Sequence, residues 1–345
     1  RAYRQNRRVR QRRRELVGCA PVARAGCPRR GASAACDNPR SALLRTAFAA
    51  HSLEHPTLLV ALLLVPGFFA LEIKDGRLYG SLVDAAQRAA PLMLAALGMS
   101  LVIAMRGIDI SVGAVVALAG TEACGLLLKG HGTALSLAAG LAVALLCGAW
   151  NALLVAALGL QPIVATLILM VAGRGLAQLI SDGQILTVYE PASFFTLGAG
   201  YWLGLPVALF VVAGLYGLVA LALRRTALGL FIQAVGLNPV AARLAGLRSS
   251  LLIALSYIAC AACAGLAGLM IASNIKSADA NNAGQLLELD AILAVTLGGG
   301  QLSGGSLNLA GTLVGALIIQ TLNALIYTLG VPPQLVHEIV VAALL

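Results

Sequence analysis

The sequence predicts an all-α polytopic membrane protein with 8–10 transmembrane helices, some of them broken or re-entrant at glycine-rich segments. Of its 345 residues, 59% are hydrophobic and 11% are charged. Soluble domains carry about 25% charged residues, so this chain has too few polar side chains to cover a water-exposed surface. The mean hydropathy of +0.90 and apolar stretches near the ~20 residues that span a bilayer point the same way. This composition excludes a soluble enzyme, a disordered chain and a collagen.

Residues 1–56 are predicted to form a basic, disordered tail. Residues 1–45 hold 13 arginines against Glu15 and Asp37, a net charge of +11, whereas the other 300 residues have a net charge of −1. High charge without apolar periodicity is typical of disorder. Such a tail can bind RNA or anionic lipid, but arginine runs are usually just solvated, so we predict no nucleic-acid partner. Because the chain starts at Arg1, the tail can also be an artefact of how the sequence was bounded.

Residues 57–345 are predicted to form one membrane domain that is truncated at its C-terminus. Eight stretches have the length and composition of a span. A ninth apolar piece, Ala291–Leu297, is short, and a last helix begins near Leu335 and is cut off at Leu345. The eight stretches are Thr57–Leu71, Ala89–Met105, Val112–Leu128, Thr133–Leu160, Ile163–Ile180, Leu203–Leu223, Ser250–Ala272 and Asn308–Leu329.

Arginine in short loops predicts the orientation, since cytoplasmic loops carry an excess of Lys and Arg. The arginine-rich tail places the N-terminus in the cytoplasm. Six crossings later, the loop 224–248 lies on the same side. It contains four arginines and no acidic residue, whereas the loop 181–203, predicted to be outside, contains Asp182 and Glu190 and no basic residue.

The sequence lacks the motifs of catalysis. No lysine follows a glycine as in a phosphate-binding Walker A loop, and no G-x-S-x-G nucleophile elbow occurs. Cys260 and Cys263 form a C-x-x-C pair, but they lie in an apolar stretch without a second ligand pair, which favours helix packing over a metal site. We predict a transport subunit with no catalytic residue, metal or cofactor of its own. Any ATP it uses would be hydrolysed by a partner chain.

Polar residues between apolar stretches are the candidates for a transport path, because a charge at membrane depth costs about 2.5–3.5 kcal/mol on insertion scales. The first group is Gly107, Asp109 and Ser111. One interpretation is a tight cytoplasmic turn with Arg106 paired to Asp109 in water. The other is a broken helix in which Asp109 and Ser111 face a pathway or a neighbouring helix.

Arg174 and Gln178 form the second group, deeper within a predicted span. Three interpretations remain open for Arg174. Its side chain can snorkel to the membrane surface, pair with Asp182, or line a cavity together with Gln178.

The third group surrounds the short apolar piece. Asn281, Asn282, Glu288 and Asp290 precede it, and five glycines in eight positions follow at Gly298–Gly305. Glycine costs about 1 kcal/mol relative to alanine in a helix, so no regular helix crosses the membrane here. The segment is either a flexible loop or a discontinuous element at the translocation path.

The basic loop 224–248 is predicted to contain a short helix. Asn238 is a suitable N-cap and Pro239 a suitable first helical residue, and Gly246 would end the helix. A small helix held in a cytoplasmic loop is well suited to docking on a partner.

This loop resembles the cytoplasmic coupling loop of ribose/galactose/xylose-type sugar ABC importer permeases. The resemblance lies in Thr226-x-x-Gly229 and then Ala-Val-Gly-Leu-Asn-Pro-x-Ala-Ala-Arg-Leu-Ala-Gly at 234–246. Two more family signatures are similar to Gly-Ile-Asp-Ile-Ser-Val-Gly at 107–113 and Glu-Leu-Asp-Ala-Ile-Leu-Ala-Val at 288–295 with the glycine run after it. Within the family, the segments 163–175 and 278–284 are most similar to the galactofuranose importer permease.

The resemblance implies a permease in the bacterial inner membrane that carries a monosaccharide. It implies as partners an ABC ATPase, a second permease in a homo- or heterodimer, a periplasmic sugar-binding protein and the lipid bilayer. The loop helix would seat in a groove of the ATPase. The residues that the resemblance assigns to this coupling are Arg225, Thr226, Gly229, Gly236, Asn238, Ala242, Arg243 and Gly246.

An ion-gradient-driven secondary transporter of a small polar solute is the alternative function. Such transporters often carry buried carboxylate or histidine relays. Here Glu122 is the only carboxylate well inside one of the eight predicted spans.

Overall fold

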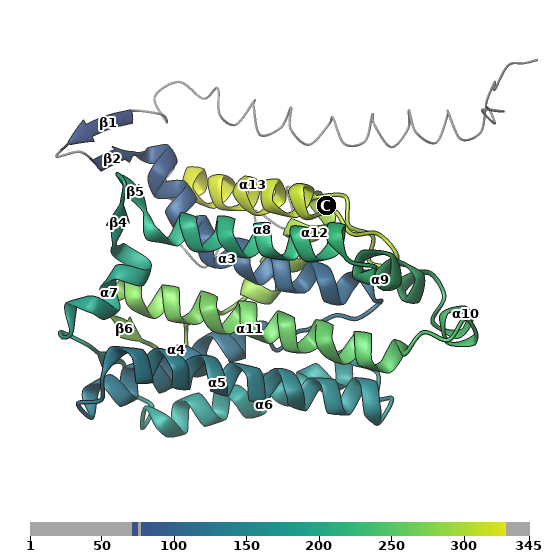
Figure 1. Cartoon of the computed structure of the whole chain (residues 1–345). Coiled ribbons are helices and arrows are strands. Elements are labelled where there is room, and N and C mark those ends of the chain that lie inside the picture. The colour runs from purple at the N-terminus through teal and green to yellow at the C-terminus, as the bar shows by residue number, and fades with distance from the viewer. Residues whose placement is uncertain (1–70, 75–76, 329–345) are drawn as a thin grey trace, which may run out of the picture. The chain divides into compact units, whose positions relative to one another are not determined.

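The computed structural model describes residues 71–74 and 77–328, with side chains over 83–324. The predicted tail, all but the last residue of the predicted span Thr57–Leu71, and the predicted helix from Leu335 to Leu345 lie outside the described residues. The described part is a bundle of long apolar helices joined by short connections (Figure 1). The prediction of an all-α membrane protein is confirmed.

The elements follow one another in an order close to the predicted one. The helices are α3 (Ser81–Ala104), α4 (Val112–Leu128), α5 (Thr133–Ala152) with the π-helical turn η1 (Leu153–Ala157), α6 (Pro162–Ile180), α7 (Ala192–Ala199), α8 (Val207–Arg225), α9 (Leu228–Leu237), α10 (Pro239–Leu244), α11 (Ser249–Ile275), α12 (Leu287–Leu297) and α13 (Leu309–Thr328). The short antiparallel strand pairs are β1 (Leu71–Lys74) with β2 (Arg77–Gly80), β3 (Leu186–Thr187) with β6 (Ser277–Ala278), and β4 (Tyr201–Trp202) with β5 (Leu205–Pro206).

Five described helices are long and apolar enough to cross a membrane: α3 from Val83, α5 with η1, α6, α8 and α11. The predicted spans at α4 and α13 correspond to shorter apolar helices. The predicted span Leu203–Leu223 begins later, at Val207. Its first residues form the turn between β4 and β5, where Leu203 and Gly204 have φ of 51° and 83° and cannot continue a right-handed helix.

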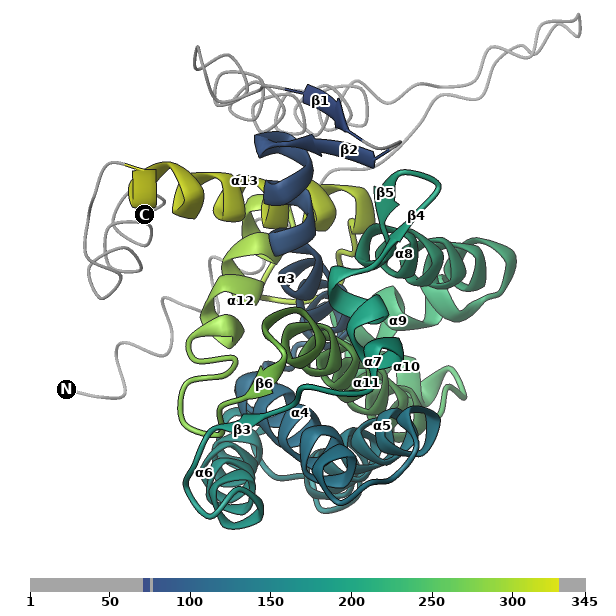
Figure 2. The same cartoon turned by 90° about the vertical axis from the view of Figure 1, so that its left-hand side faces the viewer.

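Helices α3 and α11 form the centre of the bundle. α11 packs on α3, α4 and α5, while α12 and α13 pack on the other side of α3 (Figure 2). Small residues allow this close packing, because a Cβ on Gly98 of α3 would lie 2.7 Å from Cys260 Cα of α11. Cys260 and Cys263 are buried, and the close approach of Gly98 to Cys260 supports the packing interpretation of the C-x-x-C pair.

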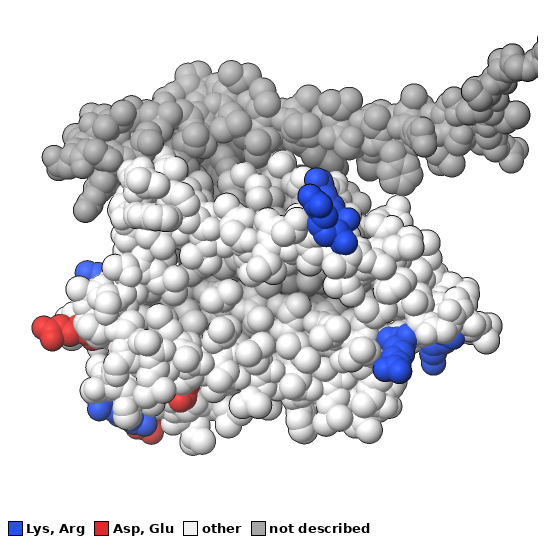
Figure 3. Space-filling model, in the orientation of Figure 1, with Lys and Arg blue, Asp and Glu red and all other residues white. Residues whose placement is uncertain are grey.

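On the face in Figure 3, charged side chains lie toward the two ends of the bundle with an uncharged band between them. The α9–α10 end carries only basic side chains, whereas the opposite end carries both acidic and basic ones. Large apolar side chains such as Leu146, Val171 and Leu179 are exposed in this structure of a single chain. A bilayer or an apolar partner surface would cover them.

Candidate functional site

Two breaks in the helices form the centre of the candidate site. Residues 105–111 separate α3 from α4, and residues 279–286 separate β6 from α12. Both breaks fall where the sequence places polar and glycine residues. Helix α12 has 11 residues, about 16 Å, which is roughly half of the ~30 Å hydrocarbon core. The region 279–305 is therefore discontinuous and not one regular helix, while its place at the translocation path stays a prediction.

Asp109 lies buried inside the first break. Only 1% of its surface is exposed, and its carboxylate accepts hydrogen bonds from Ser111 N (3.0 Å), Ser111 Oγ (2.5 Å) and Asn151 Nδ2 (3.4 Å). Thr166 of α6 also accepts a bond from Ile110 N at 3.3 Å. The interpretation of a water-exposed turn with Arg106 paired to Asp109 is wrong, because Arg106 donates instead to the carbonyls of Gly236 and Leu237.

The first turns of α4 and α12 meet between the two breaks. A Cβ on Gly113, in the first turn of α4, would overlap the Gly284 carbonyl and the Glu288 carboxylate. Glu288 is buried in the first turn of α12, and Asp290 lies half-buried in the same turn. Acidic side chains are stabilised there because the amino end of a helix carries partial positive charge.

Arg174 and Gln178 bind the second break from α6. Arg174 Nη1 donates to the carbonyls of Ala283 (2.7 Å) and Ala280 (3.2 Å), and Gln178 Nε2 donates to Asn281 Oδ1 (2.7 Å). Arg174 lies on the same helix face as Gln178, as the third interpretation expects, but its guanidinium bonds to backbone carbonyls, and a cavity lined by the pair stays a prediction. The two side chains hold an irregular backbone segment.

The second break also has a local cap. Asp279 accepts bonds from Asn281 N, Asn282 N and Asn282 Nδ2. These three hydrogen bonds keep this turn closed.

The loop 224–248 consists of α9 and α10. Asn238 Oδ1 accepts bonds from Val240 N (3.0 Å) and Ala241 N (3.1 Å), and Pro239 is the first residue of α10. Gly246 follows α10 with φ of 86°. The predicted helix start and stop are confirmed.

The other coupling candidates surround these two helices. Thr226 Oγ1 accepts a bond from Leu228 N at the start of α9, and Arg243 Nε donates to Pro239 O within α10. Ala242 is buried, Gly229 is half-buried and Arg225 is exposed. Leu244 is 86% exposed and Val240 59% exposed. The tip of α10 thus presents apolar side chains and an arginine away from the bundle.

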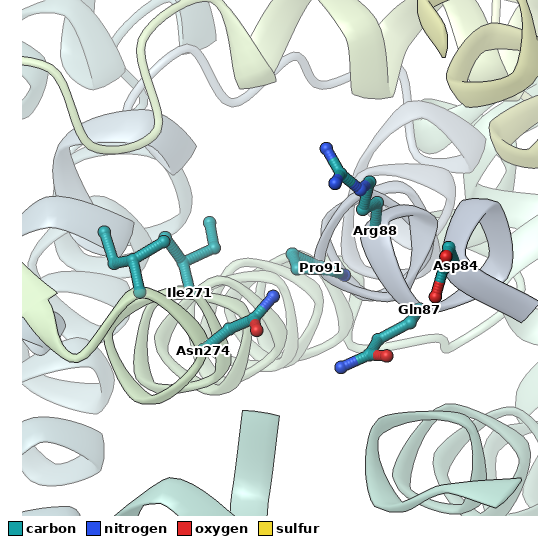
Figure 4. Close-up of a pocket in the computed structure, with 7 residues that line it drawn as sticks. Asp84, Gln87, Arg88, Pro91, Ile271 and Asn274 are labelled. Carbon is teal, nitrogen blue, oxygen red and sulfur yellow. The ribbon is translucent and has the colours of Figure 1, made fainter. Parts of the chain in front are cut away.

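A cavity of about 530 Å³ opens at the end of the bundle opposite α9 and α10. It is lined by Asp84, Gln87, Arg88 and Pro91 of α3 and by Ile271, Asn274 and Ile275 of α11. Figure 4 shows Gln87 and Asn274 pointing toward one another across it. Pro91 has no N–H, so the Gln87 carbonyl lacks its usual helical donor. Within the described residues, no group of three His, Cys, Asp or Glu side chains is placed to hold a metal ion.

Comparison with known proteins identifies the family. A family model described as the permease component of a branched-chain amino acid transport system matches residues 81–345. The chain belongs to this permease family. No solved structure matches the permease.

Curated relatives of this permease transport sugars. It is 49% identical over 292 residues to the galactofuranose transporter permease protein of Escherichia coli, covering 84% of this chain and 85% of the relative. It is 41% identical to the fructose import permease protein of Bifidobacterium longum (74% and 73% covered) and 33% identical to the ribose import permease protein of Escherichia coli (81% and 87% covered). The chain is a multi-pass membrane permease of a sugar ABC importer, as its resemblance predicted.

Sequence reasoning missed several residues of the permease site. Asn151 and Thr166 hold the first break. Both are polar residues inside apolar helices, so the sequence alone could have identified them as candidates. Gly113 also has a signal, as the last residue of the 107–113 signature. Asp84 and Asn274 had none, because they lie at the margins of apolar stretches where polar residues are ordinary.

Proposed function

We propose that this permease imports a monosaccharide, with galactofuranose as the leading candidate, across the bacterial inner membrane with its N-terminus in the cytoplasm. The observation that carries the proposal is the contact inside the bundle between Gly113, in the first turn of α4 directly after the first break, and Gly284 in the second break. Irregular backbone at membrane depth is tolerated where it is buried in protein or lines a cavity, and transporters use it at their substrate sites. The 49% identity to a galactofuranose permease supports the choice of sugar.

The proposed path begins at the cavity between α3 and α11 and continues toward the second break. Asp84, Arg88 and Asn274 offer donors and acceptors to sugar hydroxyls, and Pro91 and Ile271 offer an apolar wall to the sugar ring. Farther along, Asn281 and Asn282 are exposed on the break that Arg174 and Gln178 hold.

The proposed energy source is ATP hydrolysed by a partner subunit. The exposed tip of α10, with Val240, Arg243 and Leu244, is the surface offered to that subunit. A second permease and a periplasmic sugar-binding protein complete the assembly.

Co-purification and uptake test this function. Tagged permease, expressed with the genes that neighbour its own, is expected to retain an ABC ATPase. Proteoliposomes of that complex with the binding protein are expected to accumulate labelled galactofuranose only with ATP. Uptake driven by a proton or sodium gradient without ATP would contradict the proposal and favour a secondary transporter. ATP-driven uptake of ribose or fructose, but not of galactofuranose, would change only the proposed sugar and leave the ATP-driven import in place.

Arg243→Glu is expected to weaken the docking of α10. Reversing an exposed charge in a contact surface lowers affinity, here by an expected factor of about five or more. The measurement is the amount of ATPase retained per permease, with membrane insertion checked in parallel. Lys129→Glu, at the end of α4 and exposed, is the matched control. If both variants retain the same amount of ATPase, α10 is not part of the docking surface.

Asn274→Ala is expected to raise the KM for sugar uptake. Loss of one neutral hydrogen bond of about 1 kcal/mol corresponds to roughly a fivefold change. The ATPase rate without sugar is expected to remain that of the wild type. An unchanged KM in Asn274→Ala and in Arg88→Ala would place the sugar outside this cavity.

A further inference from the structure

Three segments that are far apart in the sequence meet at one point beneath the two breaks. Arg106 Nε donates to the Gly236 carbonyl and Nη2 to the Leu237 carbonyl, both at 2.5 Å. Gly305 N donates to the Ala104 carbonyl at 2.9 Å. We call this meeting point of residues 104–106, 236–237 and 304–305 the clasp.

Arg106 caps helix α9 within the clasp. The last four carbonyls of a helix lack helical partners, and α9 ends at Leu237. A guanidinium fits this position because it supplies several donors in a fixed fork and carries positive charge toward the negative end of the helix. The side chain thereby fixes the end of α9 to residue 106 of the first break.

The clasp is packed backbone to backbone. A Cβ on Gly236 would overlap the Ala104 carbonyl and would lie 2.5 Å from Gly305 N. Arg106 itself has φ of 64°, a conformation that favours glycine. The contact leaves no space for the three segments to slide past one another.

The first break is connected to the clasp directly, and the second break is connected to it through helix α12. Residues 107–111 lead from Arg106 to the start of α4, and residues 298–303 lead from Gly304 back to the end of α12. The other ends meet again, since the first turn of α4 packs against Gly284 and Glu288. The first turn of α4, helix α12 and the clasp thus form a closed ring of contacts.

We propose that Arg106 is a positioning residue that transmits movement of α9 to both helix breaks at once. When the ATPase displaces the α9–α10 loop, the guanidinium carries residues 104–106 with it, and the Gly304–Gly305 contact carries the end of α12. The ring then moves as a unit, so the first turns of α4 and α12 change position together. This inference rests on the proposed ATP-driven import.

Arg106→Gly tests the proposal in the reconstituted complex. Glycine suits the φ of 64°, so the substitution removes the side chain without straining the backbone. Sugar transported per ATP hydrolysed is expected to fall at least tenfold, while the ATPase rate stays within twofold of the wild type. Arg106→Lys is expected to recover part of the ratio, because an ammonium can still donate to both carbonyls. Lys129→Gly, which removes an exposed basic side chain elsewhere, is expected to keep the wild-type ratio.

A second readout follows the break itself. A cysteine at the exposed position 285 (Gln285→Cys) is expected to change its maleimide labelling rate on ATP addition in the wild-type background and not with Arg106→Gly. An unchanged transport ratio and labelling response in Arg106→Gly would overturn the proposal. If that variant does not assemble, a wild-type ratio in Arg106→Gln, which replaces the charged guanidinium by a shorter uncharged amide, would overturn it as well. Failure of the wild type to import sugar with ATP would instead refute the proposed function.

Discussion

Gly113→Ala is expected to abolish most sugar uptake and to lower the stability of the permease. The added methyl group would overlap the Gly284 carbonyl and the Glu288 carboxylate, so the first turns of α4 and α12 must separate. Gly284 has φ of 65° and sits where its chain already turns sharply, which restricts its movement. Overpacking of this kind costs about 1–3 kcal/mol. We expect uptake to fall at least tenfold and the unfolding midpoint to fall by several degrees.

Gly175→Ala is the matched control for this prediction. Gly175 lies in α6, is exposed, and has no neighbouring atom within 4 Å of an added Cβ. Alanine is favoured over glycine in a helix by about 1 kcal/mol, so the control is expected to be at least as stable as the wild type. If the uptake rate of Gly113→Ala equals that of Gly175→Ala, the contact between the first turns of α4 and α12 has no part in transport.

The elements that depend on local pattern were predictable from the sequence. Hydropathy placed α5 with η1, α6, α8 and α11 within about four residues of their observed ends, whereas α3 begins eight residues before its predicted start. The N-cap Asn238 and the stop at Gly246 followed from backbone chemistry alone. Such features need no knowledge of what lies nearby in space.

The contacts of the candidate site were not predictable in the same way. Arg106 bonds to residues about 130 positions away, and no periodicity encodes such a pairing. The choice between a wet turn and a buried break at Asp109 depended on Asn151, 42 positions away. Helix α7 was missed because its eight residues lie in a loop whose length alone indicated an irregular connection.

Asp109→Ala is expected to have the second large effect. The Asp109 carboxylate is the acceptor for Ser111 N, Ser111 Oγ and Asn151 Nδ2, all in the buried interior. Each buried donor left unpaired costs about 1–3 kcal/mol. The Ser111 hydroxyl and Asn151 can still pair with each other at 2.9 Å. The backbone N–H of Ser111 is therefore the donor that loses its acceptor. We expect a lower unfolding midpoint and at least a tenfold loss of uptake.

Asp109→Asn separates a structural role of this residue from a titrating one. An asparagine keeps an acceptor for Ser111, and its amide can donate to Asn151 Oδ1, which has no hydrogen-bond partner within the described part of the chain. If Asp109 anchors the break, Asp109→Asn therefore retains most of the stability and ATP-driven uptake that Asp109→Ala loses. A secondary transporter that moved a proton or cation through this carboxylate would lose uptake equally in both variants, because neither side chain ionises. Uptake rates of the two variants, normalised to the amount of folded permease, decide between an anchored break and an ion-coupled path.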